Sequence, residues 1–267
     1  MPGRFFIQKF LRNAVNAKCD YSIVEMTSQG AQQFRNKFID LDALLFTNLA
    51  PEHIESHGSY ENYRKAKVGI AKGLGKSSKP RRILVVNGDD KEAVHFLSVS
   101  NVEKHVYHIN DASPYSTTPD FSNFTIYNKK IHFKLPGLFN IYNSLAGIAF
   151  AETQLISPAV IESALEKMEK IGGRVEKITL PAENPLAKKQ NFDVVVDYAH
   201  TPDSLEALYK AFEGKERICV LGNTGGGRDT WKRPVMGGIA DKYCEQIILT
   251  NEDPYDENPE QIVNEVA

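Results

Sequence analysis

Carboxylates and imidazoles in the first sixty residues occupy positions from which they could bind a cation. Glu25 lies in the apolar run 22–26, where an unpaired carboxylate would be costly to remove from water. The stretch 48–58 contains two histidines, among them His53, and two glutamates. Oxygen ligands with one imidazole suit a hard cation such as magnesium better than zinc. The alternatives are a Glu25 that points outward from a strand and a histidine that lies on the surface or caps a helix.

A lysine follows on one face of a predicted helix. Tyr60, Tyr63, Lys67 and Ile70 are spaced to share that face, which is otherwise largely apolar. A buried amine has a lowered pKa and can be modified chemically. A lysine whose stem packs on apolar surface while its ammonium reaches water would have the same spacing.

Two later segments could bind a nucleotide or another anion. Asn140 and Asn143 lie one turn apart at a predicted helix start, where they could contact a nucleobase edge or cap the helix. The glycine-rich stretch 221–234 carries three cations and could approach an anion through backbone N–H groups, or form a flexible surface loop. It is not a Walker A loop, whose Gly-x4-Gly-Lys-[Ser/Thr] pattern occurs nowhere in the chain.

The elements that must position these residues alternate between short β-branched runs and helical spacing. This alternation predicts an α/β fold with a mostly parallel sheet flanked by helices, in which ligands bind where strands end. The predicted strands are 21–26, 43–47, 82–87, 106–109, 193–197, 217–221 and 246–250. The predicted helices are 7–16, 60–72, 139–152, 158–170, 202–212 and 259–266. A hairpin is expected at 121–134, and a domain boundary near Gly173 divides 1–173 from 174–267.

Composition narrows the class of protein further. The 267 residues suffice for two domains, and 32 Lys and Arg nearly balance 34 Asp and Glu, which favours neither nucleic acid nor an anionic membrane. Three cysteines without metal-type or redox-pair spacing indicate a reduced, cytosolic setting. There is no signal-peptide pattern at the start and no run near the roughly 20 apolar residues that span a bilayer. We therefore expect a cytoplasmic protein that binds neither nucleic acid nor membrane.

Seven segments, taken in order, resemble the Mur ligases, and within them the MurE-type UDP-N-acetylmuramoyl-tripeptide synthetases. The segments are 25–30, 47–53, 57–67, 135–143, 173–176, 197–203 and 226–234. The resemblance runs through nearly the whole chain. It implies a central ATPase-type domain at 1–173, followed by a truncated Rossmann-like α/β domain at 174–267.

The resemblance implies a role for each matching residue. The residues that would be catalytic and hold Mg2+ are Glu25, His53 and Lys67, the lysine as a carbamate. Those that would bind ATP are Asn140, Asn143, Arg174, Asp197 and His200. Those that would bind substrate are Thr27, Ser28, Gln33, Arg35, Arg228 and Asp253.

The reaction that the resemblance implies has two steps. A carboxylate of UDP-N-acetylmuramoyl-L-Ala-D-Glu attacks the γ-phosphate of ATP to form an acyl phosphate, and the amine of an amino acid then displaces the phosphate. The resemblance further implies a monomer that uses ATP and Mg2+. Two alternatives stay open: a non-catalytic binding protein that keeps the ligase fold, and a related ligase such as a folylpolyglutamate synthase.

The chain departs from the family pattern in several places. The family's phosphate loop is absent, so we expect an interior fragment that is inactive by itself. Glu52 replaces the usual aspartate before the metal-binding histidine, and Gln29 stands where a histidine is common. The sequence at 252–255 is Glu-Asp-Pro-Tyr, where diaminopimelate-adding enzymes have Asp-Asn-Pro-Arg. Without that arginine, lysine or another amino acid is as plausible a substrate as diaminopimelate.

Overall fold

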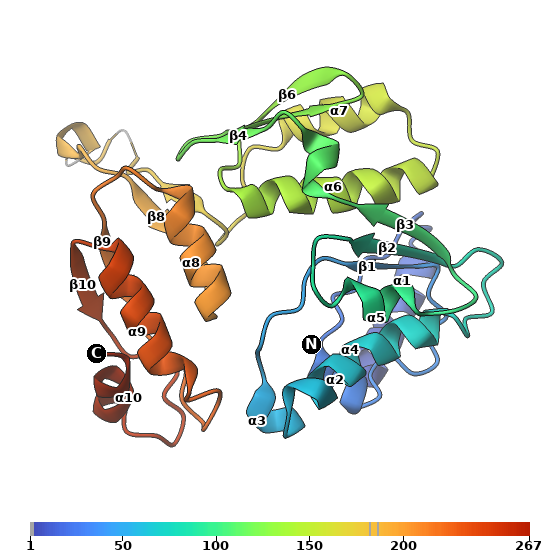
Figure 1. The fold of residues 1–267 in the computed structure, drawn as a ribbon, viewed down its shortest axis with the longest axis horizontal. Helices are drawn as coiled ribbons and strands as arrows, with labels where there is room; N and C mark the ends of the chain where they lie inside the picture. Colours follow the sequence, from blue (N-terminus) through green and yellow to red (C-terminus); the bar gives the residue numbers. More distant parts are fainter. Residues whose placement is uncertain (1–2, 182, 186) are drawn as a thin grey trace. The chain divides into compact units, whose positions relative to one another are not determined.

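The structure, a computed structural model, describes residues 3–181, 183–185 and 187–267 and divides into two compact units, Met1–Tyr107 and His108–Ala267. Figure 1 shows the elements of each unit in chain order. Both units combine helices with short sheets, so the predicted α/β class is confirmed.

The first unit is built on a parallel three-stranded sheet in the order β1-β2-β3. Its strands are β1 (Ala43–Phe46), β2 (Ile83–Asn87) and β3 (Glu103–Tyr107). Every residue of β2 is buried, as expected for the central strand of a parallel sheet. The helices are α1 (Arg4–Asn16), α2 (Ser28–Gln32), α3 (Ile54–His57), α4 (Tyr60–Leu74) and α5 (Ala93–Leu97).

Helices α4 and α5 lie on the same side of this sheet (Figure 1) and form the core of the unit with it. The Phe46 ring of β1 stacks on the Phe96 ring of α5, with centroids 3.8 Å apart. The Ser59 hydroxyl caps α4 by accepting the Asn62 N–H at 3.1 Å, which fixes the start of the helix that carries Lys67.

The second unit begins with an antiparallel sheet. Its strands are β4 (Ser116–Thr117), β5 (Ser122–Ile126) and β6 (Lys129–Phe133). Tyr127 and Asn128 both have positive φ, the backbone that a tight two-residue hairpin turn requires, so the predicted hairpin is confirmed. Helices α6 (Leu138–Thr153) and α7 (Pro158–Lys167) pack against it.

The rest of the second unit contains two separate strand pairs and three helices. An antiparallel pair joins β7 (Glu176–Ile178) to β8 (Val194–Val196), and a parallel pair joins β9 (Ile218–Leu221) to β10 (Gln246–Leu249). The helices are α8 (Pro202–Ala211), α9 (Lys232–Tyr243) and α10 (Pro259–Val266). Short 3₁₀ turns occupy Ile109–Ala112 and Ala187–Lys189.

Two sequence predictions about elements are wrong. Residues 21–26 form no strand, because they pair with neither edge of the sheet of the first unit, and Ile23 is 92% exposed. The strand predicted at 106–109 lies earlier, as β3, because the chain turns into a 3₁₀ segment at Ile109.

The cysteine prediction is also wrong for two of the three thiols. Cys219 of β9 and Cys244, the residue after α9, form a disulfide with Cα atoms 6.1 Å apart, whereas Cys19 is free and exposed. The separation of 25 residues gave no hint of this pair, because the parallel pairing of β9 with β10 is what brings the two residues together. Among the described residues no helix is long and apolar enough to cross a membrane.

Candidate active-site residues

Lys67 is the predicted lysine ligand of the first unit. It is half-buried on α4, and its amine lies 5.9 Å from the centre of the Tyr63 ring. Burial lowers the pKa of Lys67, while the negative charges of Glu52 and Glu25 act in the opposite direction. The amine is therefore partly desolvated and within the field of two carboxylates.

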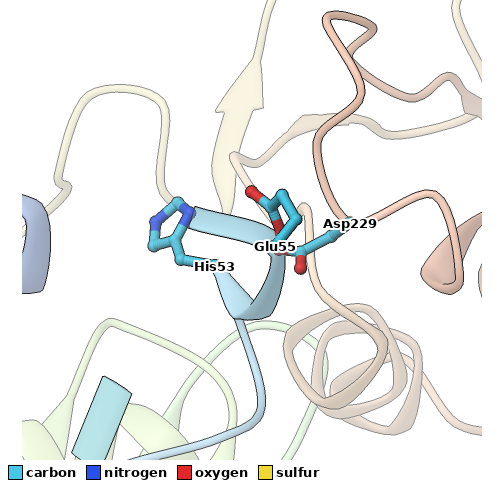
Figure 2. Close-up of side chains that lie close together, drawn as sticks. All are labelled: His53, Glu55 and Asp229. Atoms are coloured by element: carbon cyan, nitrogen blue, oxygen red, sulfur yellow. The ribbon is translucent and has the colours of Figure 1, made fainter. Parts of the chain in front are cut away.

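His53 begins α3 with an unusual backbone. Its φ is +56°, in the left-handed region that non-glycine residues seldom adopt. Its Nε2 lies 3.5 Å from Oε1 of Glu52, and its ring faces the edge of the Tyr63 ring with centroids 6.4 Å apart. Figure 2 shows the side chains of His53, the N-cap of α3, and of Glu55 on that helix, and a ring nitrogen and a carboxylate oxygen of this pair lie within 4.8 Å.

Glu25 lies two residues before Thr27, the N-cap of α2, and outside any helix or strand. Its side chain is exposed, so the expectation of a desolvated carboxylate in a strand is wrong. The Glu25 charge nevertheless acts on Lys67. Burial lowers the pKa of His57, and the positive charges of His53 and Lys67 act in the same direction. Glu25, His53 and Lys67 therefore lie in the same part of the first unit, and their role as cation ligands stays a prediction.

The donor set in this region fits a hard cation. Carboxylates and one imidazole suit Mg2+, and a carbamate on Lys67 would add a further oxygen. Glu52 and Glu55 are the two glutamates of the stretch 48–58, and both have a carboxylate near the His53 ring. Sequence reasoning counted them as possible oxygen ligands but left them out of the predicted set of Glu25, His53 and Lys67.

The predicted substrate residues of the first unit lie on and after α2. Thr27 caps this helix, since its hydroxyl accepts the Gly30 N–H at 3.0 Å. Ser28 is only 1% exposed, and Gln33 and Arg35 lie in the turn that follows the helix, exposed and half-buried respectively. Thr27 and Arg35 are thus accessible in part, whereas Ser28 is enclosed.

Three predicted ATP residues cluster in the second unit where β8 ends. Asp197 accepts the backbone N–H groups of Val175 at 2.8 Å and Ala199 at 2.7 Å. The Arg174 guanidinium stacks over the Tyr198 ring at 4.8 Å, and the His200 Nδ1–H donates to the Tyr198 carbonyl at 2.8 Å. The turn before β7 and the end of β8 therefore bring Arg174, Asp197 and His200 together.

The two asparagines at the start of α6 have different surroundings. Asn140 is buried and its amide donates to the Pro136 carbonyl at 2.8 Å, whereas Asn143 is exposed. The Asn140 donor thus fixes the turn into α6, and the exposed Asn143 is the more accessible of the two amides. Their role in adenine binding stays a prediction.

The glycine-rich loop before α9 packs against the segment 252–255. Gly225 donates its N–H to the Asp253 carbonyl at 3.1 Å, and a Cβ at Gly225 would lie 2.1 Å from the Pro254 carbonyl oxygen. The Arg228 guanidinium stacks 4.8 Å from the centre of the Tyr255 ring. The predicted substrate residues Arg228 and Asp253 therefore share one surface with Tyr255.

Sequence reasoning treated Arg233 as one of three cations of this loop that could face an anion. The side chain is instead completely buried, and it pairs with Glu257 at 2.9 Å and with Glu265. Lys232 is also buried, so Arg228 is the only exposed member of the three. Both buried cations lie in the first turn of α9.

The sequence profile of the Mur ligase middle domain matches residues 2–151, more than half of the chain. The chain belongs to the Mur ligase family. A second profile, that of the Mur ligase glutamate ligase domain, matches residues 184–267. The two matches leave a gap of about thirty residues that contains Gly173.

This Mur ligase chain is similar to curated ligases throughout its length. It is 35% identical over 277 residues to UDP-N-acetylmuramoyl-L-alanyl-D-glutamate--2,6-diaminopimelate ligase of Syntrophomonas wolfei, an alignment covering 99% of this chain and 54% of that protein. It is 32% identical over 284 residues to UDP-N-acetylmuramyl-tripeptide synthetase of Roseiflexus, covering 98% and 54%. The chain thus spans 54% of the length of these relatives.

Solved structures extend the likeness to the fold. A structure of UDP-N-acetylmuramoyl-L-alanyl-D-glutamate--2,6-diaminopimelate ligase matches with a TM-score of 0.57 at 25% identity, covering 91% of this Mur ligase chain and 50% of that one. A Mycobacterium tuberculosis folylpolyglutamate synthase complexed with ADP matches with a TM-score of 0.66 at 14% identity, covering 89% and 53%. At that identity the second match concerns the fold alone.

Proposed function

We propose that this chain is part of an ATP-dependent ligase that adds an amino acid to UDP-N-acetylmuramoyl-L-Ala-D-Glu during peptidoglycan precursor synthesis. The observation that carries the proposal is the environment of Lys67, a half-buried amine in the field of Glu25 and of Glu52, whose carboxylate lies 3.5 Å from the His53 ring. Curated relatives whose names describe this ligation support the choice of substrate.

The proposed reaction begins with attack of a substrate carboxylate oxygen on the γ-phosphorus of ATP, which releases ADP and leaves an acyl phosphate. The amine of the incoming amino acid then attacks the acyl carbon, the C–O bond to phosphate breaks, and the amine loses a proton as the amide forms. Cations contribute mainly by neutralising charge on the transferring phosphoryl group. In this scheme Thr27, Gln33 and Arg35 bind the muramoyl substrate.

We include Mg2+ in the proposal because the first unit offers carboxylate and imidazole donors that suit it. Glu25, His53 and a carbamate on Lys67 would hold it, and it would supply charge neutralisation at the phosphoryl group. Carbamate formation requires a neutral amine, and the lowered pKa of Lys67 increases the neutral fraction. A partly desolvated amine with a lowered pKa is therefore what this chain contributes to the ligand set.

The nucleotide side of the proposal uses residues of the second unit. Arg174, Asp197 and His200 contact ATP in the scheme, with Asn140 and Asn143 near its base. We also propose a domain boundary near Gly173, which is supported by family matches that end at 151 and resume at 184. Arg174 would then lie at the junction between the two domains.

The incoming amino acid is assigned to the surface formed by Arg228, Asp253 and Tyr255. An arginine at 255 would offer a bidentate partner to a second carboxylate, and a tyrosine does not. We therefore propose lysine or another amino acid, as well as diaminopimelate, as the amino acid that the ligase adds. The stacking of Arg228 on Tyr255 supports a role for this pair in that choice.

The remaining parts of the proposal concern the chain as a whole. No Walker A loop occurs within its 267 residues, so the chain alone would bind ligands without turning over ATP. We propose a cytoplasmic monomer whose partners are its small-molecule substrates, with no role for nucleic acid or membrane. The near balance of charges along the chain supports the last point.

Amino-acid-dependent release of ADP by the protein encoded by the whole open reading frame tests the function. We expect ADP only when ATP, Mg2+, the UDP-muramoyl dipeptide and one amino acid are present together, with activity lost in Lys67→Ala. Lys72→Ala, which removes an exposed lysine of the same helix, serves as the control. Tight binding of the dipeptide without ADP release would favour the non-catalytic binder, and release that depends on a folate and glutamate would favour a folylpolyglutamate synthase.

A further inference from the structure

His57 is enclosed in the first unit and makes one side-chain hydrogen bond across two helices. It is 5% exposed at the end of α3, and its Nε2 lies 3.0 Å from the hydroxyl of Ser28, which is 1% exposed at the start of α2. Its other ring nitrogen, Nδ1, is also buried and has no hydrogen-bond partner among the described residues. The Ser28 hydroxyl and His57 Nε2 therefore form an enclosed polar pair.

A second bond joins the same two helices beside this pair. The Gln29 amide donates to the Ser56 hydroxyl at 3.2 Å, and that hydroxyl donates to the His53 carbonyl at 3.1 Å. Gln29 and Ser56 are exposed, so water competes with their bond, whereas the Ser28–His57 bond is shielded. The enclosed pair is the stronger constraint on how α2 lies against α3.

The pair lies between the residues assigned to the cation. Ser28 follows Thr27, the N-cap of α2, and Glu25 comes two residues before that cap. His57 ends the single-turn helix that His53 begins, and its ring lies edge-on to Tyr63 with centroids 5.4 Å apart. One buried bond thus connects the segment that carries Glu25 to the helix that carries His53.

If the side chain at position 57 served only to pack the core, an apolar ring could fill the same space. A buried imidazole with one unbonded nitrogen is a costly choice for a core position, because unsatisfied polar atoms lose their water without compensation. What the imidazole provides is a directional bond that fixes the distance between two helix ends. That distance matters for residues that must meet at one cation.

We propose that Ser28 and His57 act as positioning residues, which hold Glu25 and His53 in the register that cation binding needs. This inference rests on the proposed function, because it takes the cation site from there. It assigns Ser28 a role through His57 in place of direct contact with substrate.

The test compares two amides at position 57. The amide of glutamine in His57→Gln can reach the place of Nε2, whereas the shorter asparagine in His57→Asn cannot. The readout is the affinity of the intact chain for Mn2+, measured by electron paramagnetic resonance in bicarbonate buffer. We expect Ser28→Ala and His57→Asn to weaken binding by about 10- to 100-fold, as removal of a supporting hydrogen bond does at metal sites. His57→Gln should stay within about threefold of the parent.

Two controls separate positioning from loss of stability. Ile83→Val shortens a buried side chain of β2, away from α2 and α3, and should lower the midpoint of thermal unfolding without changing Mn2+ affinity. The double variant Ser28→Ala/His57→Asn should lose no more affinity than either single variant, because both remove the same bond.

The outcomes distinguish the two proposals. If the parent binds Mn2+, Glu25→Gln abolishes binding, and both Ser28→Ala and His57→Asn bind as the parent does, the positioning role is overturned while the cation site stands. The positioning role is overturned in the same way if His57→Gln loses as much affinity as His57→Asn, or if the losses of the two single variants add. If the parent does not bind Mn2+ at all, both proposals are overturned.

Discussion

The carboxylate of Asp197 accepts the backbone N–H of Val175 at 2.8 Å and thereby ties the end of β8 to the residue beside Arg174. Val175 is buried with a φ of +46°, a backbone that a β-branched residue rarely adopts. Such a conformation costs about 1–3 kcal/mol and persists only where neighbouring contacts enforce it. The second Asp197 oxygen accepts the Ala199 N–H, so this one side chain fixes both ends of the cluster.

Replacing Asp197 by asparagine should therefore loosen the turn that carries Arg174. Both carboxylate oxygens face N–H donors, so an asparagine must turn its own NH2 group toward one of them. We expect Asp197→Asn to lower the free energy of unfolding by about 1–3 kcal/mol, measured by urea denaturation. Asp241→Asn, at an exposed position of α9, is the control. An unfolding curve of Asp197→Asn that overlays the parent would contradict the assigned role.

The buried guanidinium of Arg233 supports a second prediction. Glu257 pairs with Arg233 and also accepts the Gly227 N–H, so it connects the glycine-rich loop to the start of α9. Loss of this charge leaves a fully buried cation with one partner fewer. We expect Glu257→Gln to destabilise the protein by on the order of 2 kcal/mol, because the carboxylate is itself partly exposed.

The matched control for Glu257 is Glu260→Gln, an exposed glutamate in the first turn of α10. Thermal unfolding of both variants in low and high salt provides the comparison, since salt screens an exposed charge more than a pair with a buried partner. A stability loss for Glu260→Gln equal to that for Glu257→Gln would refute the importance of the buried pair.

Tyr60 should make stability depend on alkaline pH. Its hydroxyl donates to Glu92 at 3.1 Å, and burial together with this carboxylate raises the pKa of Tyr60 to about 12 from an ordinary 10.0. Below the ordinary pKa both states keep the proton. As the pH rises between these two values the unfolded state loses the proton first, so Tyr60 contributes less stability as pH increases.

Chemical denaturation from about pH 9 to about pH 11 measures this effect. The difference in unfolding free energy between the parent and Tyr60→Phe should shrink across the range, because phenylalanine has no proton to lose. Tyr115→Phe, which alters an exposed ring, should leave a constant difference from the parent. A Tyr60→Phe difference that stays constant with pH would show that the hydroxyl titrates as it does in the unfolded chain.

The α/β class and most helices could be predicted from sequence because they depend on local periodicity. Helix α4 is an example: its apolar spacing and the cap at Ser59 are both visible in the sequence, and the predicted start at Tyr60 is the observed one. The segment 21–26 has the apolar character of a strand but forms none, because strand formation depends on a neighbour that sequence periodicity does not reveal.

The candidate site could be predicted only in part, because some of its contacts join residues that are far apart in the sequence. Sequence reasoning named Glu25, His53 and Lys67 from residue types and family resemblance, and the fold brings their charges together. It did not find the bond between Ser28 and His57, which are 29 residues apart. Nor did it find the enclosure of Arg233, because its partners Glu257, in the turn before α10, and Glu265, on α10, are distant in sequence and leave no local pattern.

The last prediction concerns the amino acid that the proposed ligase adds. Arg228 stacks on the exposed Tyr255 ring, and the family's diaminopimelate-adding members have an arginine where Tyr255 stands. An arginine there could form a bidentate pair with the far carboxylate of diaminopimelate. We expect Tyr255→Arg, in the full-length protein, to raise kcat/KM for diaminopimelate relative to lysine by roughly tenfold or more, the worth of one charge-assisted hydrogen bond.

Amino-acid-dependent ADP release with each of the two substrates measures this ratio. Tyr255→Phe keeps the ring under Arg228 and should leave the ratio near that of the parent, while Tyr255→Lys adds charge without the planar fork and should change it less than Tyr255→Arg. A ratio that does not move in Tyr255→Arg would place amino-acid selection elsewhere. The candidates for that selection would then be Arg228 and Asp253, whose accessible groups lie on the same surface.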